Sequence, residues 1–249
     1  MQIKKILLPV LGLAMLLGGC SKQNTNNITI SNDSSVIGGN KQQESEKLIK
    51  AAFAWEEVDD TKVLSDFNTL YITHEAYEEI PGFNCYELWG VTNIDHIHTN
   101  ASKIAIDYEP YQNEDWKENI GEYLTAYIDF LENYDGEAIV VIPSWWSRDK
   151  YKEYLEKIVE YSDGVVIMAY QVGNEYEISK EEIELCKKYG KSFVVGYEIQ
   201  PLKEGMDEDS TYNKDLDAVY KNFHDQFDEV ENVNGYAIHY YRYIKEILS

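Results

Sequence analysis

The stretch Lys103-Ile104-Ala105-Ile106-Asp107-Tyr108-Glu109-Pro110 passes from an apolar run into two carboxylates. A continuous apolar run of this kind is typical of a strand that is buried on both faces in a parallel sheet. Runs of the same character occur along the rest of the chain. They predict six strands, at Thr69–Thr73, Lys103–Ile106, Ala138–Ile142, Gly164–Ala169, Phe193–Gly196 and Gly235–Ile238.

Amphipathic helices are predicted between these strands, because apolar residues recur there at spacings of three and four. Ser147 is a candidate N-cap for the second helix. Ser179 and Glu182 have capping-box spacing, and Gly190 suits the end of the same helix. Repeated strand–helix units predict parallel strands with right-handed crossovers, and hence a barrel or a doubly wound sheet. The predicted helices are Trp116–Tyr134, Tyr151–Val159, Ser179–Gly190 and Leu216–Phe227.

The ends of the predicted strands favour the barrel, because functional side chains of α/β barrels gather at the C-terminal ends of the strands. We therefore predict an α/β barrel of the TIM type. Residues 74–102 show no strand pattern, so we expect the first half of the barrel to be incomplete or irregular. The unusual strand ends are His74-Glu75, Asp107-Tyr108-Glu109, Ser144-Trp145-Trp146, Tyr170-Gln171, Glu198 and His239-Tyr240.

The N-terminus has the features of a secretory signal. Two lysines in Met1–Lys5 precede the run Ile6–Gly19, which is too short as a helix to cross a membrane. The sequence Leu17-Gly18-Gly19-Cys20 resembles the bacterial lipobox. This resemblance implies cleavage before Cys20, a diacylglyceryl group on its sulfur, and a membrane anchor outside the cytoplasm. An ordinary signal peptide with a chance cysteine is the alternative.

Three segments follow from this pattern. Residues 1–19 are the expected signal peptide, residues 20–43 form a polar, Asn- and Ser-rich flexible tether, and residues 44–249 form one globular domain. Cys186 lies in a predicted helix and Cys85 in a predicted loop, so we do not expect these two cysteines to pair.

The acidic composition of the chain argues against some classes of binding partner. The chain has 45 Asp+Glu against 22 Lys+Arg, a formal net charge of −23. Such a chain repels phosphate, which argues against nucleic-acid binding and against charge-driven binding to an anionic membrane. The sequence has no Gly-x-Gly-x-x-Gly, Walker loop or Gly-x-Ser-x-Gly pattern, so we predict no nucleotide cofactor and no serine hydrolase.

Asp107 and Glu109 are the sharpest candidates for chemistry. They are two residues apart at a strand end, so both side chains point to the same side. Repulsion between two close carboxylates raises the pKa of one, which suits general-acid catalysis. A solvated acidic loop is the alternative in so acidic a chain.

These residues resemble the family 18 glycoside hydrolases, which have Asp-x-Glu at one strand end and a Met-x-Tyr motif, here Met168-Ala169-Tyr170. The chain is also similar, over about residues 66–248, to bacterial secreted barrel proteins described as glycosidases or as proteins of unknown function. The family resemblance implies that Glu109 protonates the leaving oxygen, that Asp107 orients a 2-acetamido group and that Tyr170 binds this group. Ala105 and the ending His239-Tyr240 depart from the family pattern.

Glu198 offers a second mechanism, in which Glu109 and Glu198 resemble the acid/base and nucleophile of a retaining barrel glycosidase. Carboxyls about 5–5.5 Å apart suit retention, and about 6.5–9.5 Å suits inversion. Glu198 is alternatively a structural carboxylate satisfied by neighbours. His239 either hydrogen-bonds a site carboxylate or is a core histidine. Aromatic rings that suit stacking on a sugar are Trp145, Trp146, Tyr111, Tyr170 and Tyr240.

The segment Asp95-His96-Ile97-His98 is the rival constellation, because His-x-His on a strand places two metal ligands on one face. No apolar run precedes it, so we predict no metal site. The sequence thus predicts a glycoside hydrolase acting on an extracellular or cell-envelope glycan. A glycan-binding barrel lipoprotein without turnover is the alternative, and a metal-dependent hydrolase is the third hypothesis.

Overall fold

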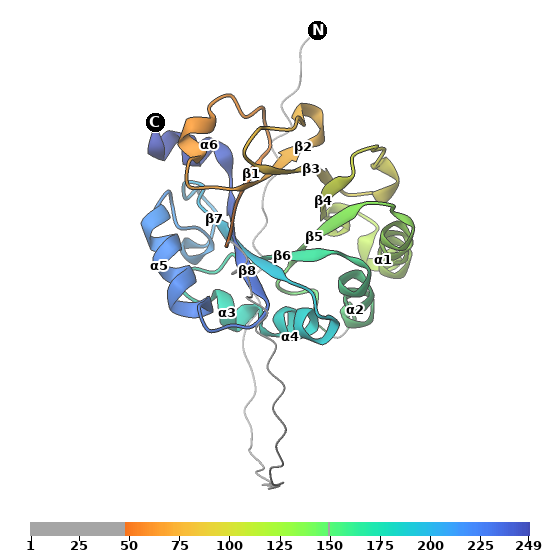
Figure 1. Cartoon of the computed structure of the whole chain (residues 1–249). Helices are drawn as coiled ribbons and strands as arrows, with labels where there is room; N and C mark the ends of the chain where they lie inside the picture. The colour runs from red at the N-terminus through yellow and green to blue at the C-terminus, as the bar shows by residue number, and fades with distance from the viewer. Residues whose placement is uncertain (1–47, 149) are drawn as a thin grey trace, which may run out of the picture. The chain divides into compact units, whose positions relative to one another are not determined.

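Eight parallel strands in the computed structural model form a closed barrel, with the strands in chain order and β1 paired with β8 (Figure 1). The structure describes residues 48–148 and 150–249; the predicted signal peptide, Cys20 and the tether lie outside these ranges. The fold is therefore an α/β barrel of the TIM type. Its strands are β1 (Ile49–Ala54), β2 (Thr69–Thr73), β3 (Asn84–Val91), β4 (Lys103–Tyr108), β5 (Glu137–Pro143), β6 (Gly164–Met168), β7 (Phe193–Glu198) and β8 (Val233–His239).

Two of the eight strands, β1 and β3, were not predicted from the sequence, and they complete the barrel. The sequence of β1 is IKAAFA, and its alanines lack the β-branched or aromatic character typical of strands. β3 carries the charged Glu87 in its middle, where the carboxylate accepts a hydrogen bond from the indole of Trp89 (2.9 Å). The prediction of six strands is therefore corrected to eight.

Gly235 allows the barrel to close, because it lies where β8 meets β1. Its φ is +151°, a conformation that residues with a side chain rarely adopt. A Cβ atom at this position would lie 1.8 Å from the carbonyl oxygen of Ile49. The backbones at this junction approach more closely than any other residue would permit.

Helices cover the second half of the barrel more fully than the first (Figure 1). Between β1 and β4 the structure has only the short 3₁₀ turns η1 (Thr61–Leu64), η2 (His74–Ala76) and η3 (Ile94–His96). The first half is therefore irregular in its helices and regular in its strands. From β4 onward the elements are η4 (Pro110–Gln112), α1 (Trp116–Asn133), α2 (Lys152–Tyr161), α3 (Glu175–Ile178), α4 (Lys180–Tyr189), η5 (Glu208–Ser210), α5 (Leu216–Phe227) and α6 (Tyr241–Leu248).

One predicted N-cap is wrong, and the other, Ser179, is the N-cap of α4 as predicted but does not form a capping box. The N-cap of α2 is Tyr151, not Ser147. Ser179 precedes α4, but its hydroxyl makes no capping hydrogen bond, and the carboxylate of Glu182 instead accepts one from the backbone N–H of Ser147 (3.2 Å). The end of α4 is as predicted, because Gly190 adopts the left-handed conformation there (φ +64°).

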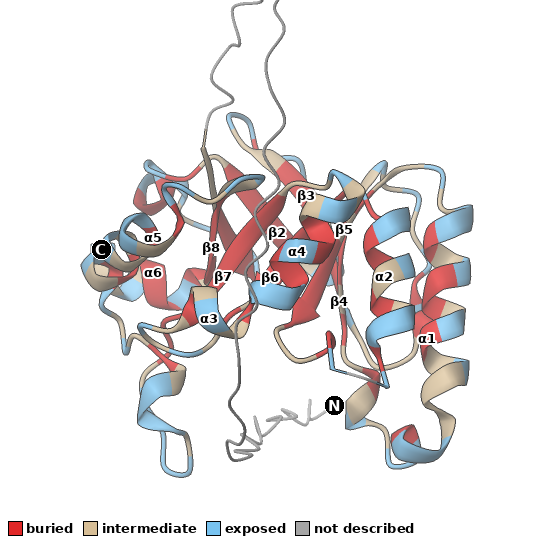
Figure 2. Cartoon of the chain, turned by 90° about the horizontal axis from the view of Figure 1, so that it is seen from below, coloured by how far each residue is buried: buried red, intermediate tan, exposed pale blue. Residues whose placement is uncertain are grey.

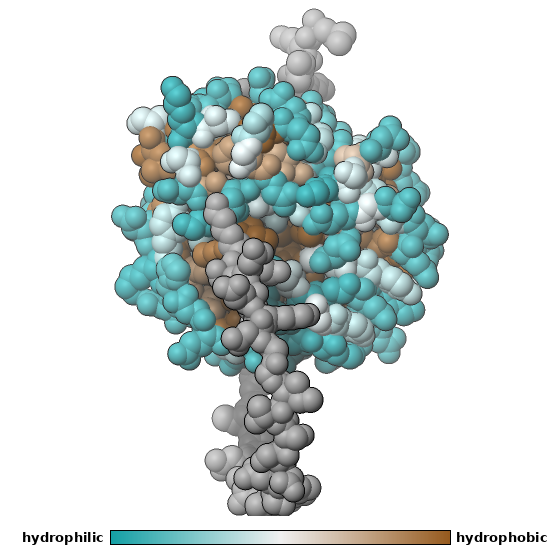
Figure 3. Space-filling view, in the orientation of Figure 1, coloured by the Kyte–Doolittle hydropathy of each residue, from teal (hydrophilic) through white to brown (hydrophobic). Residues whose placement is uncertain are grey.

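Apolar side chains form two layers, one inside the barrel and one between the strands and the helices. Figure 2 shows the strands as buried and the helices as buried on one face. On the face seen in Figure 3, hydrophilic residues form most of the surface of the described residues. The inner layer consists of Ala51, Phe53, Tyr71, Tyr86, Leu88, Ala105, Val141, Val166, Val194 and Ala237.

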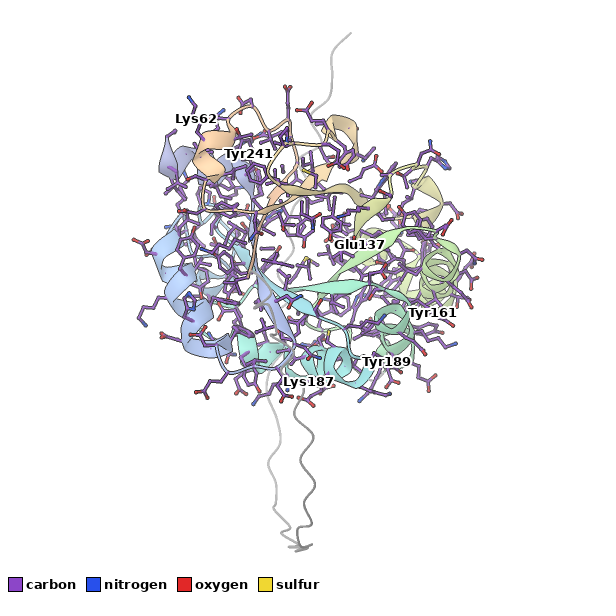
Figure 4. All side chains as sticks on the ribbon, in the orientation of Figure 1. Lys62, Glu137, Tyr161, Lys187, Tyr189 and Tyr241 are labelled. Carbon is purple, nitrogen blue, oxygen red and sulfur yellow. The ribbon has the colours of Figure 1, made fainter. Side chains whose placement is uncertain are left out.

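Polar groups close the N-terminal end of the barrel. The hydroxyl of Tyr86 donates to Glu137 (2.5 Å), and Lys103 lies 3.7 Å from the same carboxylate. Figure 4 labels Glu137 on β5, and it labels Tyr161 on α2 and Lys187 and Tyr189 on α4, outside the barrel. Because these polar groups satisfy one another's hydrogen-bonding and charge requirements, we assign this end of the barrel a structural role. The open end of the barrel is the C-terminal end.

The two cysteines in the described residues, Cys85 and Cys186, are both buried and unpaired. Cys186 lies in α4 as predicted, whereas Cys85 lies in β3 and not in a loop. No helix in residues 48–148 and 150–249 has the length and apolar character needed to cross a membrane.

Candidate active site

Three carboxylates surround Tyr170 at the C-terminal end of the barrel. Strand alternation turns Ala105 into the barrel, so Asp107 at the end of β4, and Glu109 just after it, point the same way. Burial raises the pKa of Tyr170 well above its usual range, and the charges of Glu198, Asp107 and Glu109 raise it further. Charges act strongly over only a few ångströms, so the structure brings these predicted residues together.

The surroundings of Asp107 disfavour its ionised form. Its Oδ1 atom is buried and has no hydrogen-bond partner among the described residues. Burial raises the pKa of Asp107 well above its usual range, and the charge of Glu109 adds to the rise. A carboxylate without donors is costly to ionise, so we expect Asp107 to bind a proton at pH values where exposed aspartates are charged.

Glu109 lies beside Asp107 and is supported by its own turn. Pro110 begins η4 directly after it, and the side chains of Tyr111 and Gln112 each donate a hydrogen bond to its carboxylate. Burial raises the pKa of Glu109, while the hydrogen bond from Tyr111 opposes this rise, as would a positive charge on His239. Because the net direction is upward, Glu109 retains its proton to a higher pH than an exposed glutamate does.

Glu198 is a buried carboxylate whose two oxygens are both engaged. It is 4% exposed, and its Oε1 accepts a hydrogen bond from the backbone N–H of Gln200 (2.7 Å). Its Oε2 lies 2.6 Å from Nδ1 of His239 and 3.1 Å from Nε2 of Gln200. The predicted contact of His239 with a site carboxylate is thus present, and Glu198 also has the neighbours that a structural carboxylate needs.

Tyr170 forms part of the wall of a cleft of about 960 Å³, but Asp107, Glu109 and Glu198 do not line it. Trp145 is half-buried in the same wall. The ring of Tyr111 meets Trp145 edge to face at a centroid distance of 5.3 Å, and so connects Glu109 to the cleft. The loops that supply this wall follow β5, β6 and β7, and their lining residues include Ser144, Ser147, Arg148, Gln171, Glu177 and Asp209.

Two of the aromatic residues that were predicted to contact a ligand lie outside the cleft wall, although the ring of Tyr240 is 4.9 Å from that of His239. Trp146 is fully buried (0% exposed) against the outer core, so its ring is not offered to a ligand. Tyr240 precedes α6, where its ring packs 4.9 Å from that of Tyr243 and the guanidinium of Arg242 lies 5.9 Å from it. Neither residue lines the cleft.

Trp55 and Gln200 belong to the site and were not predicted. The indole N–H of Trp55 donates to Nε2 of His239 (2.8 Å). Trp55 follows β1 directly, so recognition of that strand would have identified it as a strand-end residue. Gln200 lies two residues beyond Glu198, and no sequence pattern distinguishes its amide from that of other loop glutamines.

The segment with the two closely spaced histidines does not form a metal site. His96 ends the turn η3, and Asp95, His96 and His98 are all exposed, so the two rings do not share one face of a strand. Within residues 48–148 and 150–249, no group of three or more His, Cys, Asp or Glu side chains could hold a metal ion.

No protein-family model matches the chain, and a comparison with curated proteins finds no match. What the structure establishes is a closed, eight-stranded, all-parallel α/β barrel of the TIM type with a carboxylate cluster at its C-terminal end.

Proposed function

We propose that this protein is a glycoside hydrolase that acts on an extracellular or cell-envelope glycan by carboxylate acid/base catalysis. One observation carries the proposal: Asp107 and Glu109 lie side by side at the C-terminal end of the barrel, and both have raised pKa values. Ionisation of either carboxyl disfavours ionisation of the other, so the pair retains a proton to a higher pH than an exposed carboxyl does. The cleavage of a glycosidic bond requires a proton donor, and Tyr111 connects Glu109 to Trp145 in the wall of the cleft.

Glu109 is the proposed proton donor. As the bond between the sugar and the leaving oxygen breaks, Glu109 gives its proton to that oxygen, and its carboxylate then accepts a proton from the attacking water. Asp107 is its proton-bearing partner. Tyr111 donates to the Glu109 carboxylate and stabilises it once the proton has left.

Glu198 is proposed to supply negative charge opposite the positive charge that develops on the sugar ring. Its oxygens already accept hydrogen bonds from Gln200 and His239, which supports a fixed carboxylate more than a mobile nucleophile. Trp145 and Tyr170 in the cleft wall would contact the sugar, because an aromatic ring suits the apolar face of a pyranose.

The test is hydrolysis of a panel of chromogenic glycosides and polysaccharides by the wild type and by Glu109→Gln. We expect the variant to lose at least about a hundredfold of any activity found, because general-acid catalysis contributes about 10²–10⁴-fold. Glu114→Gln is the matched control, since Glu114 is exposed in the same loop. Full activity of Glu109→Gln, with an unchanged circular dichroism spectrum, would exclude Glu109 as the acid.

A second candidate function is glycan binding without turnover. Both oxygens of Glu109 accept hydrogen bonds within its own loop, and both oxygens of Glu198 do so as well. Carboxylates saturated in this way favour binding over catalysis. Isothermal titration with oligosaccharides separates the two functions, because saturable binding without product release supports the binding barrel.

We further propose that the protein is attached to the membrane through Cys20 and works outside the cytoplasm. The lipobox-like sequence before Cys20 supports this address. Cys20→Ser should move the protein from the detergent phase to the aqueous phase in a Triton X-114 partition. An unchanged partition would contradict the proposed anchor.

A further inference from the structure

A line of hydrogen bonds crosses three strand ends at the C-terminal mouth of the barrel. Trp55, after β1, donates from Nε1 to Nε2 of His239 at the end of β8 (2.8 Å). Nδ1 of His239 lies 2.6 Å from Oε2 of Glu198 at the end of β7. The side chain of His239 is 22% exposed and that of Glu198 is 4% exposed, so both bonds are largely shielded from water.

Chemistry fixes the direction of each bond. The indole N–H can only donate, so Nε2 of His239 must be the unprotonated, accepting nitrogen. A neutral imidazole carries one proton, which is then on Nδ1 and is donated to Glu198. Glu198 also accepts two hydrogen bonds from Gln200, so three donors converge on a carboxylate that in its ionised form only accepts.

We propose that Trp55 is a positioning residue: its indole N–H holds His239 in the Nδ1–H tautomer, and this tautomer keeps Glu198 in place as a fixed negative charge. An imidazolium would direct a second N–H at the indole N–H, and two donors facing each other repel. The role of Glu198 in turnover rests on the proposed function, whereas the tautomer of His239 does not.

Other groups around His239 are few. Phe53 on β1 lies at a ring distance of 5.9 Å, and Tyr170 after β6 at 6.2 Å. Glu109 is within electrostatic reach, because a positive charge on His239 would lower its pKa. Tyr240 is the next residue in the chain, with its ring at 4.9 Å. The only direct hydrogen-bond partners of the imidazole among the described residues are therefore Trp55 and Glu198.

The position of Trp55 depends on a glycine of β3, which is two strands away from β1 in the barrel. A Cβ atom at Gly90 on β3 would lie 2.7 Å from Cζ3 and 2.8 Å from Cη2 of the Trp55 ring. These distances are shorter than any van der Waals contact, so a side chain at position 90 would displace the indole. Gly90→Ala therefore removes the Trp55 hydrogen bond by a second route that leaves the tryptophan itself intact.

The direct test is ¹⁵N NMR of histidine-labelled protein, in which the nitrogen shifts report the tautomer. The chain has five histidines, and the His239 signals are those missing from the spectrum of His239→Gln. In the wild type at neutral pH we expect a proton on Nδ1 and none on Nε2. In Trp55→Phe and Gly90→Ala, Nε2 no longer faces a donor, and we expect a proton on Nε2 in addition to the one on Nδ1.

Trp89→Phe is the matched control, because it removes an indole N–H that donates to Glu87 and makes no hydrogen bond to His239. A wild-type proton on Nε2 would overturn the proposal, and so would a Trp55→Phe spectrum identical to the wild type. The measurement needs no substrate. If the tautomer is as expected and no glycan is cleaved, the proposed function alone fails.

Once a glycan that the protein cleaves is known, the pH profile of its hydrolysis gives a second readout. A positive charge on His239 lowers the pKa of Glu109, so Trp55→Phe should move the alkaline limb of activity to lower pH. We expect kcat/KM to fall by about tenfold to a hundredfold, as when a partner that orients a site histidine is lost. Trp89→Phe should leave the limb in place, and a Trp55→Phe limb that also stays would contradict the role in turnover.

Discussion

The neutral state of Asp107 can be tested through stability, without any substrate. Asp107→Asn replaces the carboxyl by a group of the same shape that never ionises. The native pKa of Asp107 is raised, while in the unfolded chain it has the ordinary value of about 3.9. Below that pH both states bind the proton. As the pH rises from there to the native pKa, only the unfolded state gives its proton up, so the free energy of unfolding of the wild type falls.

The size of the effect follows from this linkage. The wild type loses about 1.4 kcal/mol per pH unit at Asp107 between the two pKa values, and Asp107→Asn loses nothing there. The stability of the variant relative to the wild type should therefore rise by about 1.4 kcal/mol per pH unit above pH 4. For a domain of this size, 1 kcal/mol shifts Tm by about 2–4 °C. A constant offset of about 1–3 kcal/mol is expected from the unpartnered amide of the asparagine.

The assay is urea unfolding of both proteins at each pH unit from 4 to 8, because the difference cancels the other carboxylates of the chain. Asp135→Asn is the control, since Asp135 is exposed and lies away from the site. If the difference between Asp107→Asn and the wild type is independent of pH, Asp107 is ionised in the native state. The reasoning about its unpartnered oxygen would then be refuted.

Two further predictions concern other parts of the molecule. Gly235→Ala should lower the free energy of unfolding by more than about 4 kcal/mol or prevent folding, because the new Cβ atom would overlap the carbonyl of Ile49. Near-UV circular dichroism and urea unfolding measure this effect. A variant with native-like stability would mean that the β1–β8 junction is looser than described. Tyr111→Phe removes a hydrogen bond that lowers the pKa of Glu109, so the alkaline limb of the pH profile of glycan hydrolysis should move to higher pH. This shift is opposite to the one expected for Trp55→Phe. A shift to lower pH would contradict the role assigned to Tyr111.

The part of the fold that sequence patterns predicted is the part in which apolar runs and helical spacing agree. β2, the strands β4 to β8 and the helices α1, α2, α4 and α5 all lie where those patterns indicated. β1 was missed because alanine suits a crowded position inside a barrel but does not distinguish a strand from a helix. β3 was missed because Glu87 is paired with Trp89, and a sequence does not show such a pair.

The candidate site divides in the same way. Asp107, Glu109, Tyr170, Glu198 and His239 were predictable because strand ends converge in a barrel. Trp146 was not separable from Trp145, since the two are adjacent and only packing decides which ring is buried. Glu182 was predicted to cap its own helix, but its carboxylate instead accepts a hydrogen bond from the backbone of Ser147. Ser147 lies in the loop after β5, and the sequence does not show that this loop lies next to α4.

The junction between β1 and β8 has a consequence for how the protein acquires its site. Phe53 pairs with His239, and Trp55 bonds to His239 across 184 residues of chain. β1 therefore waits through the synthesis of the whole domain with one edge unpaired, and the last strand to be made supplies its partner. The ion pair between Arg242 and Glu56 joins the same two ends of the domain. A nascent chain interrupted before residue 239 has every predicted carboxylate of the site but lacks the hydrogen-bonded histidine. The complete site therefore forms in a single step at the end of folding.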